Sequence, residues 1–265
     1  LGHGYLWPNI AHLANTCTRF YSSHCPNVQT PVLSVADMHI SRGRAGQAYR
    51  VELASLTLHA GEAVAIVGPS GCGKSTLLEA LGLILKPERV QQFRLLTTDL
   101  AADLSLRAGR RESQWARLRQ HHMGYVPQTG GLLPFLTVRQ NIALPASMSG
   151  YTIQGLLLDR LVERLQLTSL LNRYPRELSI GERQRVSFAR AVAHQPALIL
   201  ADEPTAALDP NLAHELFALI LETVREFKIA ALIVTHEWSI VAESKLRKVV
   251  AAVQADHRTV FDEQP

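Results

Sequence analysis

The sequence contains little cysteine, with only three such residues among 265. Three cysteines cannot form the dense disulfide framework that stabilises small secreted domains. Cys72 lies within a glycine-rich stretch, while Cys17 and Cys25 lack the C-x-x-C spacing of a zinc or redox site. The cysteine content therefore excludes a disulfide scaffold and favours a reducing, cytosolic setting.

Long hydrophobic runs are also missing. The longest ones, residues 197–201 and 229–234, are as short as strands and far below the ~20 residues of a membrane-spanning helix. The net charge of +4 is too small to indicate nucleic-acid binding by itself. However, hydrophobic residues make up 47% of the chain and its mean hydropathy is +0.03, so there is enough apolar material for a packed core. The composition predicts a folded protein of one large or two small domains.

Residues 1–30 differ from the rest of the chain. They combine several histidines and two of the three cysteines with no clear hydrophobic period, and Pro8 and Pro26 interrupt them. They also lack the charged start and apolar core of a signal peptide. We expect a loosely ordered N-terminal extension here rather than a metal site, followed by one domain over residues 31–265.

Strand-like and helix-like stretches alternate from residue 31 onward. The predicted strands cover residues 32–40, 50–58, 63–67, 197–201 and 229–234, with a weaker one around Val126 and a final pair around 249–261. The predicted helices cover residues 74–84, 180–194 and 211–227, the last with Asp209 as its N-cap and an apolar stripe from Leu212 to Phe227. Short apolar strands between amphipathic helices are typical of an α/β fold with a mainly parallel sheet. Such sheets bind ligands at the carboxyl ends of their strands.

Residues 68–75 match the pattern G-x-x-x-x-G-K-[ST] between a predicted strand and a predicted helix. In that setting successive backbone N–H groups face phosphate oxygens, and the helix N-terminus adds partial positive charge. Lys74 would bridge the β- and γ-phosphates of a nucleotide, and the Ser75 hydroxyl would bind Mg²⁺. A plain glycine-rich turn is the alternative, but every specified position matches. The candidate nucleotide-binding residues here are Gly68, Pro69, Ser70, Gly71, Cys72, Gly73, Lys74, Ser75 and Thr76, and the Cys72 thiol is expected to pack rather than react.

Two carboxylates, Asp202 and Glu203, follow the apolar strand at residues 197–201. In phosphate-loop enzymes the first such carboxylate holds Mg²⁺, and the second can polarise the attacking water. Acidic residues also end strands as turn formers, here before Pro204. The presence of Lys74 and Ser75 favours the metal interpretation.

The segment Leu178-Ser179-Ile180-Gly181-Glu182, with Asp202 and Glu203 one helix and strand later, resembles the signature motif of ABC-transporter ATPases. The resemblance covers nearly all of residues 32–261 in the family's motif order. It implies an α/β fold with a RecA-like P-loop NTPase core. An antiparallel β subdomain is then expected near residues 32–60, and a helical subdomain near residues 129–180.

The resemblance also assigns roles to single residues. Gln128 resembles the loop glutamine that contacts Mg²⁺ and senses the membrane partner, and His236 resembles the switch histidine that contacts the γ-phosphate. Residues 207–209 resemble the loop that crosses a dimer interface. Two such domains would sandwich two ATP molecules, each presenting Ser179, Gly181 and Glu182 to the other's phosphate loop. The implied catalytic residues are Glu203, His236, Lys74 and Gln128, and the implied Mg²⁺ ligands are Ser75, Gln128 and Asp202.

The chain departs from the family pattern at three places. Ile180 replaces a usual glycine and Glu182 a usual glutamine, although Ser179 and Glu182 also form a capping-box pattern at a helix start. Capping alone is the simpler interpretation of that pair, and both can hold. No aromatic residue stands at residues 42–45, where the family stacks a ring on adenine, and Tyr49 is the nearest candidate.

Residues 132–145 resemble the branch of the family that serves lipoprotein release and macrolide-type efflux. The resemblance implies a peripheral ATPase at the cytoplasmic face of the inner membrane, which pairs with a second ATPase subunit and drives separate transmembrane permease subunits. The basic residues 107–119 are interpreted as a solvated face or a lipid contact rather than a nucleic-acid site. The alternatives are an ABC importer ATPase, a non-transport ABC ATPase of DNA repair or translation, and a nucleotide kinase.

Overall fold

The structure is a computed structural model, and it describes residues 30–43, 49–101, 104, 112–150, 155–254 and 257–264. The expected N-terminal extension falls outside these ranges, apart from its last residue. Arg44, Ala45 and residues 107–111 of the basic stretch also lie outside the described residues.

The described strands form a ten-stranded sheet in the order β5-β4-β1-β2-β10-β9-β3-β8-β7-β6. Their bounds are β1 Leu33–Arg42, β2 Tyr49–Leu58, β3 Ala63–Val67, β4 Arg89–Leu95, β5 Thr98–Asp99, β6 Met123–Val126, β7 Leu198–Asp202, β8 Ala230–Thr235, β9 Arg247–Gln254 and β10 Arg258–Gln264. The mixed sheet and its helices confirm the predicted α/β fold class. Strand β4 was not predicted from the sequence.

The strands that carry the phosphate motif are parallel and buried. β3 pairs in parallel with β8 and β9, and β7 pairs in parallel with β6 and β8. Every residue of β3, β7 and β8 is buried, because helices cover both faces of this half of the sheet. Successive residues of β7 belong to different core clusters, Leu198 and Leu200 to one and Ile199 and Ala201 to the other, as the alternation of a strand requires.

The other half of the sheet is mostly antiparallel. β1 pairs antiparallel with β2 and with β4, and β9 pairs antiparallel with β10. β10 then runs parallel to β2 and so joins the two halves. This arrangement connects the last strand of the chain to one of the first.

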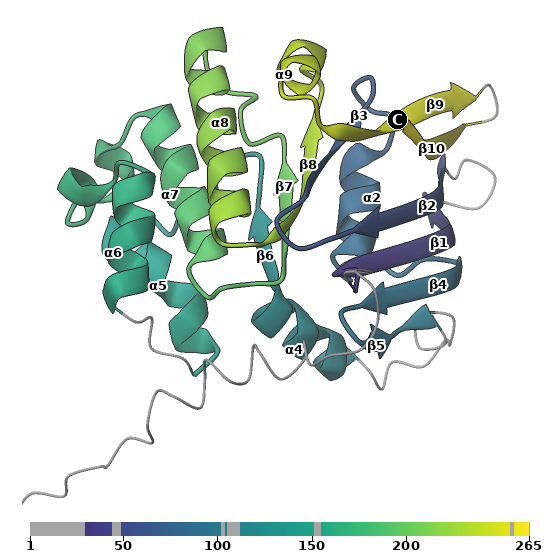
Figure 1. Ribbon diagram of the computed structural model, residues 1–265, viewed down its shortest axis with the longest axis horizontal. Coiled ribbons are helices and arrows are strands. Elements are labelled where there is room, and N and C mark those ends of the chain that lie inside the picture. Colours follow the sequence, from purple (N-terminus) through teal and green to yellow (C-terminus); the bar gives the residue numbers. More distant parts are fainter. Residues whose placement is uncertain are drawn as a thin grey trace, which may run out of the picture. The chain divides into compact units, whose positions relative to one another are not determined.

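The helices are α2 Lys74–Leu81, α4 Glu112–His122, α5 Val138–Met148, α6 Gly155–Arg164, α7 Ile180–Val192, α8 Pro210–Glu226 and α9 Trp238–Glu243, with short 3-10 turns at Thr168–Leu170 and Pro175–Glu177. Figure 1 shows α5 to α8 grouped beside the β6 end of the sheet, whereas β1, β2, β4 and β5 lie toward the opposite end. Within the described residues, no helix is long and apolar enough to cross a bilayer.

The start of α8 has the predicted N-cap, but the first leucine of its apolar stripe is partly exposed. Asp209 accepts hydrogen bonds from the backbone N–H groups of Asn211 and Leu212, which confirms it as the N-cap. Further along, Leu216 and Ile220 are buried as the apolar stripe predicts, but Leu212 is 46% exposed. Leu212 therefore lies outside the buried part of the apolar stripe, because it borders an open groove.

Candidate nucleotide-hydrolysis site

The loop between β3 and α2 has the backbone geometry of an anion cradle. Gly71 and Gly73 adopt φ of +76° and +94°, a left-handed conformation that favours glycine. At Gly73 a side chain is also excluded by space, because a Cβ would lie 2.6 Å from a methyl group of Val51. No side chain caps the start of α2, so its first N–H groups can serve a bound anion.

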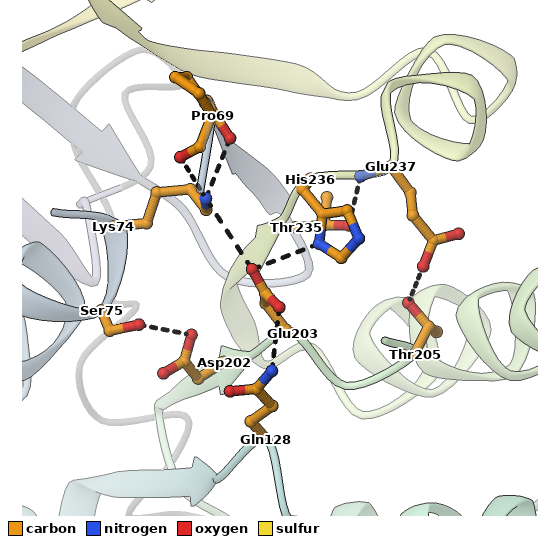
Figure 2. A network of polar contacts seen from close by, with 11 residues as sticks. Pro69, Lys74, Ser75, Gln128, Asp202, Glu203, Thr205, Thr235, His236 and Glu237 are labelled. Atoms are coloured by element: carbon orange, nitrogen blue, oxygen red, sulfur yellow. Dashed lines mark hydrogen bonds and ion pairs between the residues drawn. The ribbon is translucent and has the colours of Figure 1, made fainter. Parts of the chain in front are cut away.

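Lys74 is folded back over this loop. Its Nζ donates to the carbonyl oxygens of Gly68 at 3.0 Å and Pro69 at 2.9 Å, and the residue is only 5% exposed. The same ammonium lies 3.8 Å from a carboxylate oxygen of Glu203 (Figure 2). A positive charge is thus held at the loop where phosphate groups would enter.

Asp202 lies at the buried end of β7 beside the loop. Its Oδ1 accepts a hydrogen bond of 3.1 Å from the Ser75 hydroxyl, and the residue is 8% exposed. Burial raises the pKa of Asp202, and the neighbouring Glu203 carboxylate raises it further, although Ser75 and Lys74 act against both. A desolvated carboxylate beside a hydroxyl is an oxygen-rich setting that suits a hard cation such as Mg²⁺.

Glu203 is the centre of the polar network in Figure 2. Its carboxylate lies 3.3 Å from Nδ1 of His236 and accepts a 3.2 Å hydrogen bond from the Gln128 side chain, in addition to its ion pair with Lys74. Glu203 has a φ of +46°, which is unusual outside glycine, and its N–H donates to the Val234 carbonyl. The backbone is therefore held in a strained turn that directs the carboxylate toward the other three side chains.

A second set of bonds fixes the segments that carry these groups. The Thr205 hydroxyl donates to the Glu237 carboxylate at 3.0 Å, and the Glu237 N–H donates to the Thr235 hydroxyl at 3.0 Å. Gln184, which is 4% exposed on α7, donates to the carbonyl oxygen of Gln128. The sequence motifs assign no site role to Thr205, Glu237 or Gln184, and only their proximity to the motifs points to them.

The signature residues form a capping box at the start of α7. The Ser179 hydroxyl accepts from the Glu182 N–H at 3.2 Å, and the Glu182 carboxylate accepts from the Ser179 N–H at 2.7 Å. That backbone bond is the main reason why the pKa of Glu182 is lowered. Ile180 is 46% exposed, so its side chain does not fill the core.

The structure does not bring the signature to the phosphate loop of the same chain. Among the described hydrogen bonds and ion pairs, none connects Ser179, Gly181 or Glu182 with residues 68–76. Their implied part in nucleotide binding, in which they face the phosphate loop of a second chain, stays a prediction.

Cys72, Arg42 and the adenine candidate Tyr49 are all engaged in contacts. Cys72 is 3% exposed, and burial raises the pKa of its thiol, as expected for a packing residue. Arg42 contacts Thr76 and Glu79 on α2, while the Tyr49 hydroxyl forms a short hydrogen bond with the Thr259 hydroxyl. Arg44 lies outside the described residues.

Comparison with known proteins decides the family. The family model described as ABC transporter matches residues 51–206, which is more than half of the chain. The chain belongs to the ABC transporter family. It is accordingly an ATP-binding ATPase, which confirms the predicted family and activity.

Two curated relatives are similar to most of this ABC ATPase chain. It is 39% identical over 203 residues to the lipoprotein-releasing system ATP-binding protein LolD of a Ruegeria strain, covering 76% of this chain and 86% of LolD. It is also 39% identical over 219 residues to the macrolide export ATP-binding/permease protein MacB of Shigella flexneri. That match covers 82% of this chain but only 32% of MacB, so the chain spans about a third of that relative.

Two solved structures of the cassette MJ0796 share the fold. One is a dimer with a TM-score of 0.70, and the other is a dimeric post-hydrolysis state bound to ADP and phosphate with a TM-score of 0.69. Both are 26% identical to this chain, and each alignment covers 86% of this chain and 96% of the cassette.

Proposed function

We propose that this ABC ATPase is the motor subunit of an export or lipoprotein-extraction system. Two copies, or one copy and a related ATPase, close around two ATP molecules and drive separate transmembrane permease subunits from the cytoplasmic face of the inner membrane. The observation that carries the hydrolytic part is the position of Glu203 among Lys74, Gln128 and His236. The relatives named for lipoprotein release and macrolide export favour this branch over an importer ATPase.

Glu203 acts as the general base in this proposal. Its carboxylate accepts a proton from the attacking water, while Gln128 and His236 hold it in place through contacts of 3.2 and 3.3 Å. Lys74 stabilises the negative charge of the β- and γ-phosphate oxygens, and His236 contacts the γ-phosphate. The Glu203 carboxylate is 17% exposed, so water can reach it.

Mg²⁺ would be held by Asp202, Ser75 and Gln128. The Gln128 amide nitrogen is used on Glu203, so its amide oxygen is the atom that would serve a cation. When bound there, Mg²⁺ would supply positive charge that offsets the negative charge of the nucleotide's phosphate groups. The raised pKa of Asp202 supports this site, because a cation offsets the cost of a buried carboxylate.

The test is the isosteric substitution Glu203→Gln. We expect ATP binding to persist and turnover to fall roughly 10²–10⁴-fold, because a glutamine amide cannot accept the proton. ATP turnover and nucleotide affinity are measured side by side, and size-exclusion chromatography should show an ATP-trapped dimer. The matched control is Glu243→Gln, since Glu243 is an exposed carboxylate on α9 whose ion pair among the described residues is with His214. Near-normal turnover in Glu203→Gln would show that another group is the general base, and His236 would be the next candidate.

A further inference from the structure

A groove lies between the start of α7 and the first turns of α8. It has a volume of about 310 Å³, and its lining includes Leu208, Leu212, Leu216 and Leu219 together with Ser179 and Gly181. The hydrolytic mechanism uses none of these leucines. Leu212 leaves 46% of its surface exposed at the rim, an arrangement that favours association with another apolar group.

The second feature is an exposed tryptophan beside the hydrolytic network. Trp238 is the first residue of α9, two positions after His236, and it is 47% exposed. The preceding residue Glu237 is fixed by its bonds with the Thr205 and Thr235 hydroxyls. The indole is therefore presented from a segment that is held in place, which lowers the entropy lost when it binds. Tryptophan is also among the residue types most enriched in binding hot spots.

We propose that, when ATP closes the dimer, Trp238 of each protomer inserts into this groove on the other protomer. The inference rests on the proposed function, a dimer closed around two ATP molecules. By the family resemblance, the signature of one chain then meets the γ-phosphate bound by its partner. His236 contacts that phosphate from its own chain, and Ser179 meets it from the opposite chain. Trp238, two residues from His236, then faces the leucines that adjoin Ser179.

The chemistry of the groove suits an indole. Four leucines provide an apolar surface, and its volume is at the lower end of the ~300–1,000 Å³ of small-ligand pockets, which fits a single large side chain. A buried indole N–H needs an acceptor, and Glu215 provides a carboxylate in the lining. Because a two-fold dimer repeats every contact, each closed dimer contains two such insertions.

Cross-linking between two different chains tests the contact directly. One chain carries Trp238→Cys and the other Leu212→Cys, both with Cys17→Ser and Cys25→Ser, while the buried Cys72 is retained. With a short bifunctional maleimide, we expect a linked heterodimer with ATP and Mg²⁺ but not with ADP. The matched control replaces Leu212→Cys by Ile84→Cys, because Ile84 is 56% exposed but follows the end of α2 opposite to the phosphate loop. That pair should not link.

Dimer affinity provides the second measurement. Trp238→Ala should weaken the affinity of the ATP-dependent dimer at least roughly 30-fold, as for a hot-spot residue. The affinity of Trp238→Phe should lie between those of Trp238→Ala and the wild type. ATP binding by the single chain should not change, and sedimentation would measure the dimer. If the mixed cysteine pair associates with ATP but does not link, or if Trp238→Ala dimerises like the wild type, the insertion is refuted and the proposed function stands. A wild-type chain that stays monomeric with ATP contradicts both.

Discussion

Single residues at this site are positioned by partners that lie far away in the sequence. The Glu203 carboxylate contacts Gln128, which lies 75 residues earlier in the sequence, and it also contacts Lys74 and His236. The motifs allowed each residue to be predicted singly, because each has a fixed spacing from its own strand or helix. The strained φ of Glu203 could not be predicted, because it depends on the bond from its N–H to Val234 on the neighbouring strand.

Arg42 is a residue whose surroundings suggest a role in base recognition. It is the last residue of β1, and its side chain contacts α2, where its Nη1 lies 3.0 Å from the Glu79 carboxylate and 3.4 Å from the Thr76 hydroxyl. Its side chain is 58% exposed. A guanidinium plane beside the phosphate loop can stack on a purine, but it does so without distinguishing one purine from another.

We therefore expect GTP to compete with ATP within roughly tenfold, about 1.4 kcal/mol. Tyr49 is the competing candidate, but its hydroxyl is bonded to Thr259 and its ring lies against Gly73, where a Cβ would be 3.1 Å from the ring. Competition binding is measured on the wild type, Arg42→Ala and Tyr49→Ala, with Tyr49→Phe as the control for folding. A strong ATP preference that disappears in Tyr49→Ala would identify Tyr49 as the stacking residue and contradict the prediction.

At the scale of helices and strands, local sequence predicted the parallel half of the sheet better than the rest. β3, β7 and β8 are short apolar runs that require burial on both faces, so their composition identifies them. β4 was missed because its sequence RVQQFRL buries only three of seven residues and carries two arginines. The parallel pairing of β10 with β2 joins segments about 200 residues apart, and no local pattern reports such a contact.

The capping box of α7 supports a prediction on stability. Ser179→Ala should lower the free energy of unfolding by about 1 kcal/mol, because the Glu182 N–H loses its acceptor at the helix start. Ser179→Thr keeps an acceptor and is the matched control. Urea denaturation measures both variants, and equal stability of Ser179→Ala and the wild type would show that the serine is retained for nucleotide contact alone.

The pH dependence of this cap has a definite sign. The Ser179 N–H lowers the pKa of Glu182 in the folded state, so the folded chain binds that proton less tightly than the unfolded chain. The stability from Glu182 is therefore present above its unfolded-state pKa and is lost as the pH falls through the lowered value. Glu182→Gln should flatten the stability profile in this acidic range.

At the scale of the whole molecule, one chain holds two incomplete halves of a site. The phosphate loop and Glu203 lie together at the ends of β3 and β7, whereas Ser179 lies at the start of α7 and shares no described bond with them. The order of motifs predicted both halves, since each is a local pattern. In our proposal their union is a contact between two copies, and no local pattern of one chain reports such a contact.

The last prediction tests this division by mixing two defective chains. A Lys74→Ala chain cannot hold phosphate, and a Ser179→Arg chain places a bulky cation where the proposal has the partner's nucleotide. Each homodimer then has two defective sites, but the mixed dimer unites the intact loop of one chain with the intact signature of the other. We expect ATP-dependent heterodimers in the mixture and no ATP-dependent dimers of either variant alone. Affinity capture of differently tagged chains measures the association. Ser179→Thr, which keeps the cap, should behave like the wild type. If the mixture fails to associate under conditions in which the wild type dimerises, the two halves do not meet across the interface.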